Sequence, residues 1–167
     1  MIQKSPNKSC SIDPIPTSLL KTCIDELAPA ITTIINGSLQ NGKMPKCLKH
    51  SIVTPRIKKP NLPFEPKSFR PVANLSFLSK LIAQALINQL NEHFETNNLN
   101  EPLQSGYKPY HSTQTALIRI LNDMLRAIDD GNVVMLALLD LSAAFDVINH
   151  DIFLSRMVNS QGIHCAV

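Results

Sequence analysis

The stretch that decides the predicted fold class is "NVVMLALLDLSAAFD", residues 132–146. Residues 133–139 are apolar at every position, so both faces of a strand here would be hydrophobic. Strands of this kind lie inside a sheet that is covered on both faces. The run ends at Asp140, and a carboxylate that is buried without a partner costs several kcal/mol. The sequence therefore predicts a buried central strand that holds Asp140 rigidly at the rim of a sheet.

Two partners for the Asp140 carboxylate stay open from the residues alone. A hydrogen-bonded cap on the following turn would satisfy the carboxylate without any function. A Mg²⁺ ion would satisfy it too, because Mg²⁺ takes one or two carboxylates together with substrate phosphates and waters. Phe145 alone would be predicted as core packing, and the role of Asp146 stays open.

Length and composition indicate the class of protein. The 167 residues are 44% hydrophobic and 17% charged, which suits one globular domain. The four cysteines show neither metal-ligand nor redox spacing, so we expect free thiols in a reducing compartment. The beginning of the chain has no apolar signal-peptide core, and the longest apolar run is too short to cross a bilayer. We therefore expect a cytoplasmic or nuclear protein with no membrane partner.

Basic residues are concentrated in one part of the chain. Residues 43–70 hold eight lysines and arginines against one acid, a net charge of +7, whereas the whole chain carries +3. Six of the twelve prolines fall within 45–71, so this part should be extended. The segment is either a solvated basic loop or a surface that binds phosphates.

Periodicity predicts a helix-rich α+β protein with a small sheet. Helical spacing of apolar residues and capping signals predict two short helices in 16–45 and further helices over 76–98, 112–131 and 149–157. Thr17 or Ser18 would cap the first helix, Pro29 would open the second, and Gly42 would end it. The prolines predict an edge strand over 51–59 and an extended loop over 60–75, in addition to the central strand.

Several motifs, in order along the chain, resemble one family. "LLDLSAAFDVINH" is similar to the first catalytic motif of reverse transcriptases from non-LTR retrotransposons of the Jockey and related LINE clades. "SIVTPRIKK" and "FRPVANLSFLSKLI" resemble the fingers segment that opens the polymerase domain. "LQSGYKPYHSTQTALIRILNDMLRAIDDG" resembles the segment between fingers and palm. The resemblance extends over about residues 9–164 and implies a partial right-hand polymerase fold comprising the fingers and the start of the palm.

The resemblance assigns the end of the predicted central strand to catalysis. Asp140 matches the first acid of the family, a ligand of two Mg²⁺ ions, and Leu141 would offer a backbone carbonyl to a metal. Two metals would activate the primer 3′-hydroxyl and stabilise the leaving pyrophosphate. Phe145 matches the ring that packs beneath the incoming sugar and favours deoxynucleotides by clashing with a 2′-hydroxyl. Asp146 resembles a structural acid of the family more than a ligand.

The resemblance also assigns nucleotide contacts to the basic segment. Arg70 in "FRPVANL" matches the fingers arginine that contacts the incoming triphosphate, and a planar guanidinium suits phosphate oxygens. Lys58 and Lys59 lie where the family carries lysines, and one of the two is expected to reach the γ-phosphate. Taken alone, two adjacent lysines in a loop more often serve solubility.

A loop further along the chain matches a Gln-x-Gly-aromatic motif near the nucleotide pocket and template. Its residues are Gln104, Gly106 and Tyr107, and Gly106 would let the backbone approach a nucleotide closely. Tyr107 stands where Phe is commoner in the family.

The family pattern continues beyond this chain, into the rest of the palm and the thumb. No Asp-Asp pair follows Asp140, and the pair Asp129-Asp130 lies upstream of it. One carboxylate cannot hold two Mg²⁺ ions in working geometry, so we expect the isolated chain not to polymerise DNA. Its exposed apolar strand should also promote aggregation.

The implied function is RNA-directed DNA synthesis. Residues 1–45 would be a helical lead-in and residues 46–167 a partial reverse transcriptase domain that ends before the second catalytic motif. Its partners would be an RNA template, a DNA primer, deoxynucleoside triphosphates and the missing palm and thumb of the same polyprotein. The alternatives are a non-catalytic nucleic-acid-binding module that uses the basic segment, and a helical interaction protein with no nucleic-acid role.

Overall fold

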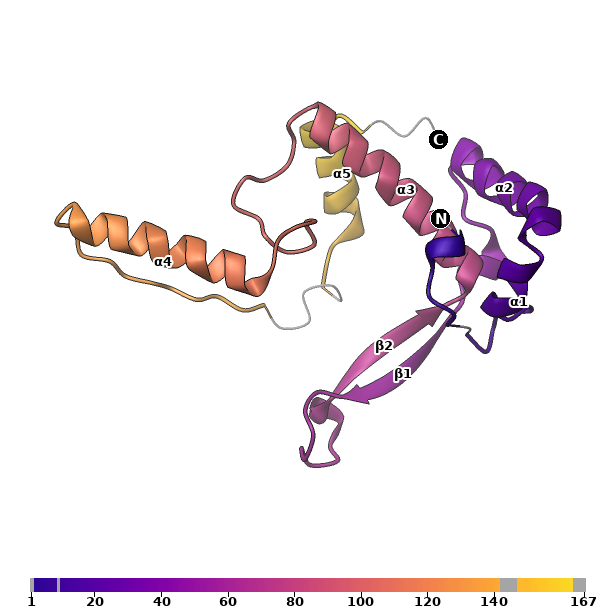
Figure 1. Cartoon of the computed structure of the whole chain (residues 1–167), viewed down its shortest axis with the longest axis horizontal. Helices are drawn as coiled ribbons and strands as arrows, with labels where there is room; N and C mark the ends of the chain where they lie inside the picture. The colour runs from indigo at the N-terminus through magenta and orange to yellow at the C-terminus, as the bar shows by residue number, and fades with distance from the viewer. Residues whose placement is uncertain (1, 9, 142–146, 164–167) are drawn as a thin grey trace. The chain divides into compact units, whose positions relative to one another are not determined.

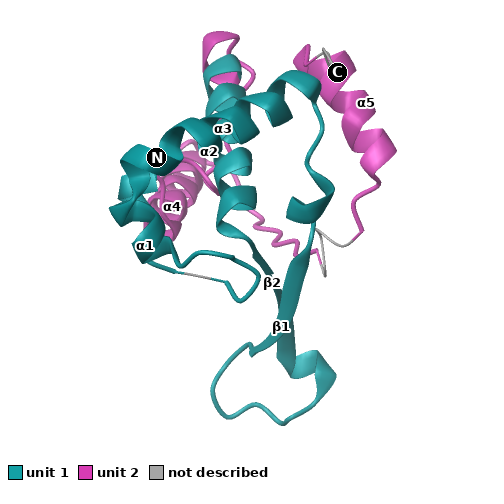
Figure 2. Ribbon diagram, turned by 90° about the vertical axis from the view of Figure 1, so that its right-hand side faces the viewer, with its two compact units in different colours: residues 1–93, 165–167 teal, residues 94–164 magenta. Residues whose placement is uncertain are grey.

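The computed structural model describes residues 2–8, 10–141 and 147–163, and it divides into two compact units (Figure 2). The first unit extends to His93 and the second begins at Phe94. The described elements are a few helices and one small sheet, as predicted for an α+β chain. The right-hand polymerase arrangement stays a prediction.

The first unit contains a helical part and a β-hairpin (Figure 1). Short 3-10 turns lie at Ile2–Lys4, Lys46–Leu48 and Pro66–Ser68. The helices and strands are α1 (Thr17–Thr22), α2 (Ile24–Asn41), β1 (Ser51–Ile57), β2 (Phe69–Leu75) and α3 (Phe77–Thr96). The helix predicted over 76–98 is confirmed as α3.

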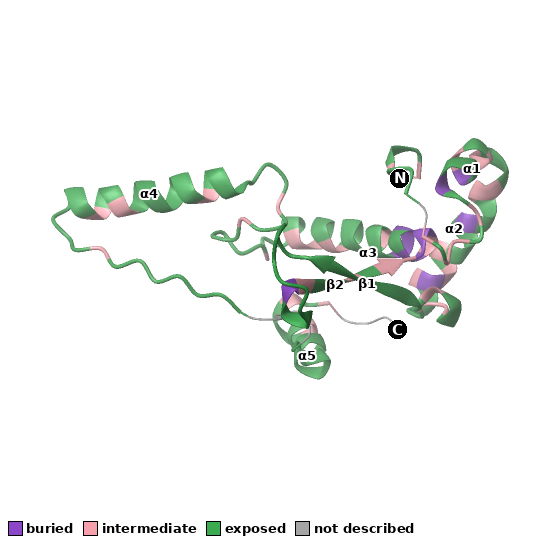
Figure 3. Ribbon diagram, turned by 90° about the horizontal axis from the view of Figure 1, so that it is seen from below, coloured by how far each residue is buried: buried purple, intermediate pink, exposed green. Residues whose placement is uncertain are grey.

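The core of the first unit lies where α1, α2 and the beginning of α3 meet. Leu20, Ile31, Phe77 and Leu81 form its buried cluster. Partly buried side chains pack around it, and they are Ile2, Ile15, Ile24, Leu27, Ile35 and Leu78. Figure 3 shows the buried positions gathered on these helices, whereas most of α4 is exposed. Ile2 and Ile15, which precede α1, therefore pack against this core.

Two predictions for the first helices are wrong. Thr17 does not cap α1 but is its first residue, with no exposed surface, and its hydroxyl donates to the Lys8 carbonyl at 3.0 Å. Pro29 lies inside α2 rather than in its opening turn, because α2 begins at Ile24 directly after α1. Gly42 ends α2 as predicted, with a left-handed φ of 55° that a side chain would disfavour.

The sheet is an antiparallel hairpin, and the hydrogen bond at one end of it shows which opposed residues are hydrogen-bonded pairs. The Lys58 N–H donates to the Ser68 carbonyl at 2.9 Å, and β1 pairs with β2 from Ser51 opposite Leu75 to Ile57 opposite Phe69. Hydrogen-bonded and non-bonded pairs alternate in such a ladder. Pro55 opposite Pro71 is therefore a non-bonded pair, and neither proline removes a ladder bond.

The hairpin confirms one strand prediction and corrects another. β1 is the predicted edge strand. Residues 69–75, predicted as the end of a loop, form β2 instead. A proline at a non-bonded position directs its nitrogen away from the partner, so Pro71 permits a strand that the residue type alone argues against.

Buried serines fix the hairpin to the helical part. Ser76 caps α3, because its Oγ accepts from the Ser79 N–H at 3.2 Å. The Ser79 hydroxyl in turn lies 2.6 Å from Oγ of Ser76 and donates to the Leu48 carbonyl at 2.6 Å. Leu48 precedes β1 and Ser76 follows β2, so this network fixes both ends of the hairpin.

The second unit contains α4 (Thr113–Asp129) and α5 (His150–Gln161). Each helix is capped by the residue that opens its predicted range: Ser112 exchanges hydrogen bonds with Thr115, and the Asn149 side chain accepts from two N–H groups of α5. No described residue of this unit is buried. The apolar stripe of α4 is therefore largely exposed.

The predicted central strand is the largest correction. Residues 132–141 are extended, but they belong to no sheet that the structure describes. Val133 is 99% exposed and Leu139 95%, so the run is not buried. An extended run becomes a strand only through a partner, and no described segment pairs with this one.

Candidate nucleotide-binding hairpin

The β1–β2 hairpin has two chemically different faces. Side chains alternate along a strand, so Arg56 and Arg70 share one face with Lys58 beyond the end of β1. The other face carries Val53, Pro55, Ile57, Phe69, Pro71 and Ala73. One face is therefore cationic and the other apolar.

Arg56 and Arg70 lie directly opposite each other across the hairpin. They are a hydrogen-bonded pair in the alternation, which sets their Cα atoms about 5.5 Å apart. Like charges at opposed positions destabilise a sheet. Both side chains are exposed, and neither forms an ion pair with a carboxylate in the part of the chain that the structure describes. The arrangement suits an anion that bridges two guanidinium groups.

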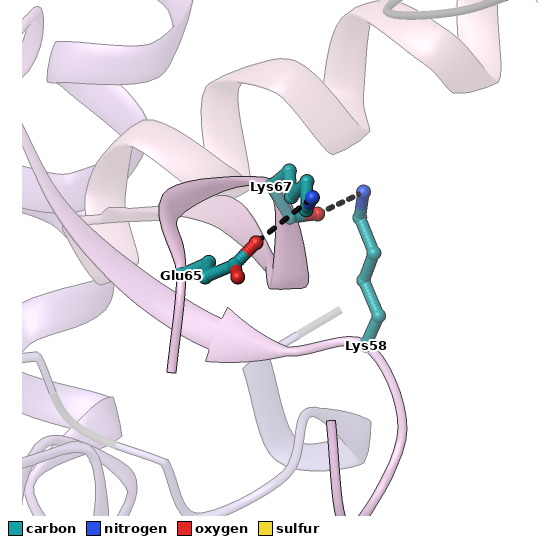
Figure 4. Close-up of polar contacts among 3 residues, drawn as sticks. All are labelled: Lys58, Glu65 and Lys67. Carbon is teal, nitrogen blue, oxygen red and sulfur yellow. Dashed lines mark hydrogen bonds and ion pairs between the residues drawn. The ribbon is translucent and has the colours of Figure 1, made fainter. Parts of the chain in front are cut away.

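Lys58 and Lys59 directly follow β1 at the tip of the same hairpin, and Figure 4 shows Lys58. The Lys58 ammonium donates to the Lys67 carbonyl at 2.7 Å, and Lys67 pairs with the Glu65 carboxylate at 2.9 Å. Lys58 therefore adds a third positive charge to the face of Arg70. Lys59 is exposed beside it.

The opposite face of the hairpin contains an apolar hollow of about 460 Å³. Phe64 contacts Phe69 edge to face, with ring centroids 5.0 Å apart, and remains 91% exposed. The hollow is lined by Val53, Pro55, Phe64, Glu65, Pro66, Phe69 and Pro71. The apolar contacts of the hairpin therefore lie on the face opposite its arginines.

The predicted Gln-Gly-Tyr loop lies in the second unit. The Gln104 side-chain amide donates to the Gly106 carbonyl at 3.1 Å, and Arg119 of α4 donates to the Pro102 carbonyl at 3.1 Å. A side chain on Gly106 would meet nothing within 4 Å, so the structure itself sets no steric demand for glycine here. The left-handed backbone is at Tyr107, whose φ is 61° and whose ring is 94% exposed.

The predicted catalytic end of the chain is only partly described. Asp140 and Leu141 are both exposed at the end of the extended run. Phe145 and Asp146 lie outside the described residues. Residues 2–8, 10–141 and 147–163 contain no cluster of three His, Cys, Asp or Glu side chains able to hold a metal ion. Among the described residues 132–141, Asp140 supplies the carboxylate.

Sequence reasoning missed Arg56 as a site residue. Arg56 lies in the motif "SIVTPRIKK", but the resemblance assigned nucleotide contacts only to Lys58 and Lys59 there, and Arg70 is far away along the chain. The strand pairing alone places the two guanidinium groups together. Recognising "FRPVANL" as a strand would have supplied the signal.

Comparison with known proteins agrees with these features. Residues 57–163 match the family described as reverse transcriptase (RNA-dependent DNA polymerase). The chain belongs to this family. The matched residues include β2, Arg70, Lys58 and Asp140, and they begin at the last residue of β1, directly after Arg56. The predicted resemblance is thereby confirmed.

The relatives of this reverse transcriptase chain are proteins of Drosophila mobile elements. It is 31% identical over 151 residues to the probable RNA-directed DNA polymerase from transposon BS of Drosophila melanogaster, covering 90% of this chain and 17% of that protein. It is 26% identical over 151 residues to the RNA-directed DNA polymerase from mobile element jockey of the same species, covering 90% and 16%. The chain thus spans a small part of the length of its relatives.

No solved structure matches the chain significantly. Within the described ranges, no helix has the length and apolar character needed to cross a membrane.

Proposed function

We propose that this chain is the nucleotide-binding fingers and first palm segment of a retrotransposon RNA-directed DNA polymerase whose other parts lie in a longer protein. The observation that carries the proposal is the cationic face of the hairpin, where Arg56 lies opposite Arg70 and Lys58 follows. Guanidinium groups bind phosphate oxygens in two-point geometry. The proposed domain comprises residues 46–167, and residues 1–45 precede it.

The ligand of this face is a deoxynucleoside triphosphate. Arg70 contacts the triphosphate, Arg56 contacts it from the opposite strand, and Lys58 or Lys59 reaches the γ-phosphate. A bound triphosphate relieves the repulsion between the opposed arginines, which supports binding on this face. Phe145 packs beneath the sugar and excludes a 2′-hydroxyl.

Asp140 and Leu141 supply the metal-binding side of the reaction. A carboxylate and a backbone carbonyl are oxygen donors of the kind that Mg²⁺ prefers, so the residues present fit the ion in type. Two Mg²⁺ ions, when bound, activate the primer 3′-hydroxyl and stabilise the leaving pyrophosphate. A single carboxylate leaves coordination positions for further acids from the longer protein.

The Gln104–Tyr107 loop contributes to the template side. Its internal hydrogen bond and its anchor on Arg119 hold it in one shape without a ligand. The exposed Tyr107 ring is available for stacking on a base of the RNA template or the DNA primer.

Binding of dATP to the 167-residue chain tests the hairpin directly. Arg56→Gln and Arg70→Gln should each weaken binding about tenfold, because each removes a charge-assisted hydrogen bond. Arg126→Gln and Arg156→Gln are matched controls, since both are exposed arginines of the second unit and should change nothing. Isothermal titration calorimetry measures all four variants. Equal losses in the controls would reject the hairpin as the site.

Primer extension on an RNA template tests the activity in a longer protein that contains the downstream coding region. Asp140→Asn should abolish extension, whereas Asp130→Asn, at the end of α4, should leave it intact. Activity that survives the Asp140 change would overturn the metal-ligand assignment. RNA binding that depends on salt but shows no response to dATP or Mg²⁺ would favour the non-catalytic nucleic-acid-binding module instead.

A further inference from the structure

A second cationic site lies in the first unit, away from the hairpin. A pocket of about 470 Å³ is lined by three lysines from two distant parts of the sequence, Lys4, Lys8 and Lys80. The remaining lining residues are Ser5, Pro6, Phe77, Leu81, Gln84 and Asn88, so no carboxylate faces the lysines from the lining. Its volume lies within the range of small-ligand pockets, about 300–1,000 Å³.

One face of α3 forms the back of this pocket. Lys80, Gln84 and Asn88 follow one another at four-residue spacing, so they form a polar row along the helix. Phe77 and Leu81 form an apolar row beside it, and both are core residues. The pocket therefore offers charge, amide groups and apolar surface within one volume.

The segment that carries Lys4 and Lys8 is held in place by hydrogen bonds. The Lys21 ammonium of α1 donates to the Ser5 carbonyl, and the buried Thr17 hydroxyl donates to the Lys8 carbonyl at 3.0 Å. Further along, the Asp13 carboxylate accepts from the Phe77 N–H at 2.6 Å, at the beginning of α3. Both walls of the pocket are thus fixed before a ligand binds.

The lining chemistry matches a nucleotide better than a simple anion. Three ammonium groups around one volume repel each other and favour a phosphate among them. Gln84 donates to the Asn88 side-chain oxygen at 3.0 Å, which leaves the Gln84 oxygen and the Asn88 NH₂ group to contact a base edge. Pro6, together with the edges of Phe77 and Leu81 that the core leaves exposed, supplies apolar surface for the body of the base.

We infer that this pocket binds one nucleotide of a single-stranded nucleic acid, with its phosphate among Lys4, Lys8 and Lys80 and its base beside Gln84 and Asn88. The inference rests on the proposed function only in taking a nucleic-acid strand as the source of the nucleotide. The hairpin and this pocket share no residue, so each can fail without the other.

Fluorescence anisotropy of a labelled oligouridylate with the 167-residue chain tests the pocket. The triple variant Lys4→Gln, Lys8→Gln, Lys80→Gln should bind about tenfold more weakly or worse. The slope of log affinity against log salt should also fall by roughly 0.7, the value for one phosphate contact on a single strand. The control is Arg126→Gln with Arg156→Gln, which removes exposed positive charges that lie outside the basic segment 43–70.

Further variants separate binding from folding. Replacing the three pocket lysines by arginine keeps their charge and should keep binding. Gln84→Glu changes one exposed side chain and places a carboxylate in the pocket, so it should weaken binding without loss of helix by circular dichroism. Wild-type affinity in the glutamine triple variant, or an equal loss in the control, would overturn the inference.

Two parallel measurements identify the source of the bound nucleotide and distinguish the pocket from the hairpin. Competition by uridine monophosphate as well as by unlabelled oligouridylate would identify a free nucleotide as sufficient, and competition by the oligonucleotide alone would identify the strand. Both results support the pocket. If Arg56→Gln with Arg70→Gln removes all oligonucleotide binding while the pocket variant removes none, the pocket is refuted and the hairpin stands.

Discussion

The β1–β2 hairpin and residues 132–141 are both extended, yet only the hairpin is a sheet. The hairpin is rich in prolines and charges, which disfavour strands, whereas residues 133–139 are wholly apolar. The difference is the partner: β1 pairs with β2 across the connection 58–68, and residues 132–141 pair with no segment that the structure describes. Strand formation here follows from available hydrogen bonds more than from residue type.

The largest expected effect comes from the same Leu→Ala change made in the core of the first unit and in the extended run 132–141. Leu81→Ala should lower the free energy of unfolding by about 2–5 kcal/mol, because Leu81 is 5% exposed in the core. Leu138→Ala should change it by less than about 0.5 kcal/mol, because Leu138 is 82% exposed. Urea unfolding followed by circular dichroism measures both. Similar losses would mean that residues 132–141 are buried in solution.

A smaller effect is expected at the base of the hairpin. Ser79→Ala should lower the free energy of unfolding by about 1–3 kcal/mol, because the Leu48 carbonyl and the Ser76 hydroxyl lose a buried partner. Ser18→Ala, on the exposed side of α1, is the matched control. The same urea titration applies, and an unaffected Ser79 variant would remove the serine network as the anchor of the hairpin.

The prolines of the hairpin should matter less still. Pro55→Thr with Pro71→Thr restores two N–H groups that point away from the ladder, so no strand pairing should change. Stability should fall only by about 0.4–1 kcal/mol per site, because the unfolded chain gains freedom. Amide hydrogen exchange on Arg56 and Arg70 should keep its protection. Lost protection there would contradict the alternation of the ladder.

The smallest change in stability is expected in the apolar extended run. Met135→Lys with Leu139→Lys should alter the free energy of unfolding by less than about 0.5 kcal/mol, because both side chains are exposed. The same variant should shift the mass measured by light scattering from aggregates toward the monomer. A wild-type chain that is already monomeric at high concentration would refute the predicted aggregation.

Much of the helical structure could be predicted from the sequence. Apolar spacing and the caps Ser112 and Asn149 located α4 and α5, because these signals act over one or two turns. The strands could not be predicted equally well, because a strand depends on a partner elsewhere in the chain. For this reason the residues around Pro71 were predicted as a loop although they form β2. Residues 133–139 were predicted as a strand although they pair with no described segment.

The candidate sites show the same difference between local sequence signals and contacts that only the fold creates. Lys58, Arg70 and Asp140 were found because each lies in a short motif that resembles the family. Arg56 needed the register of β1 on β2, and the lysine pocket needed the N-terminal residues to pack on α3. Neither juxtaposition is visible in local sequence, since each joins residues that are far apart along the chain.

The alternating faces of the hairpin also limit how this segment can evolve. Side chains change face at every residue, so one residue inserted in β2 between Arg70 and Leu75 would shift the Arg70 guanidinium to the side of the apolar hollow. An insertion of any length between Lys59 and Pro66 would leave both strands in register. Length variation should therefore accumulate at the tip of the hairpin, while the spacing of Arg70 from Ser76 should stay constant.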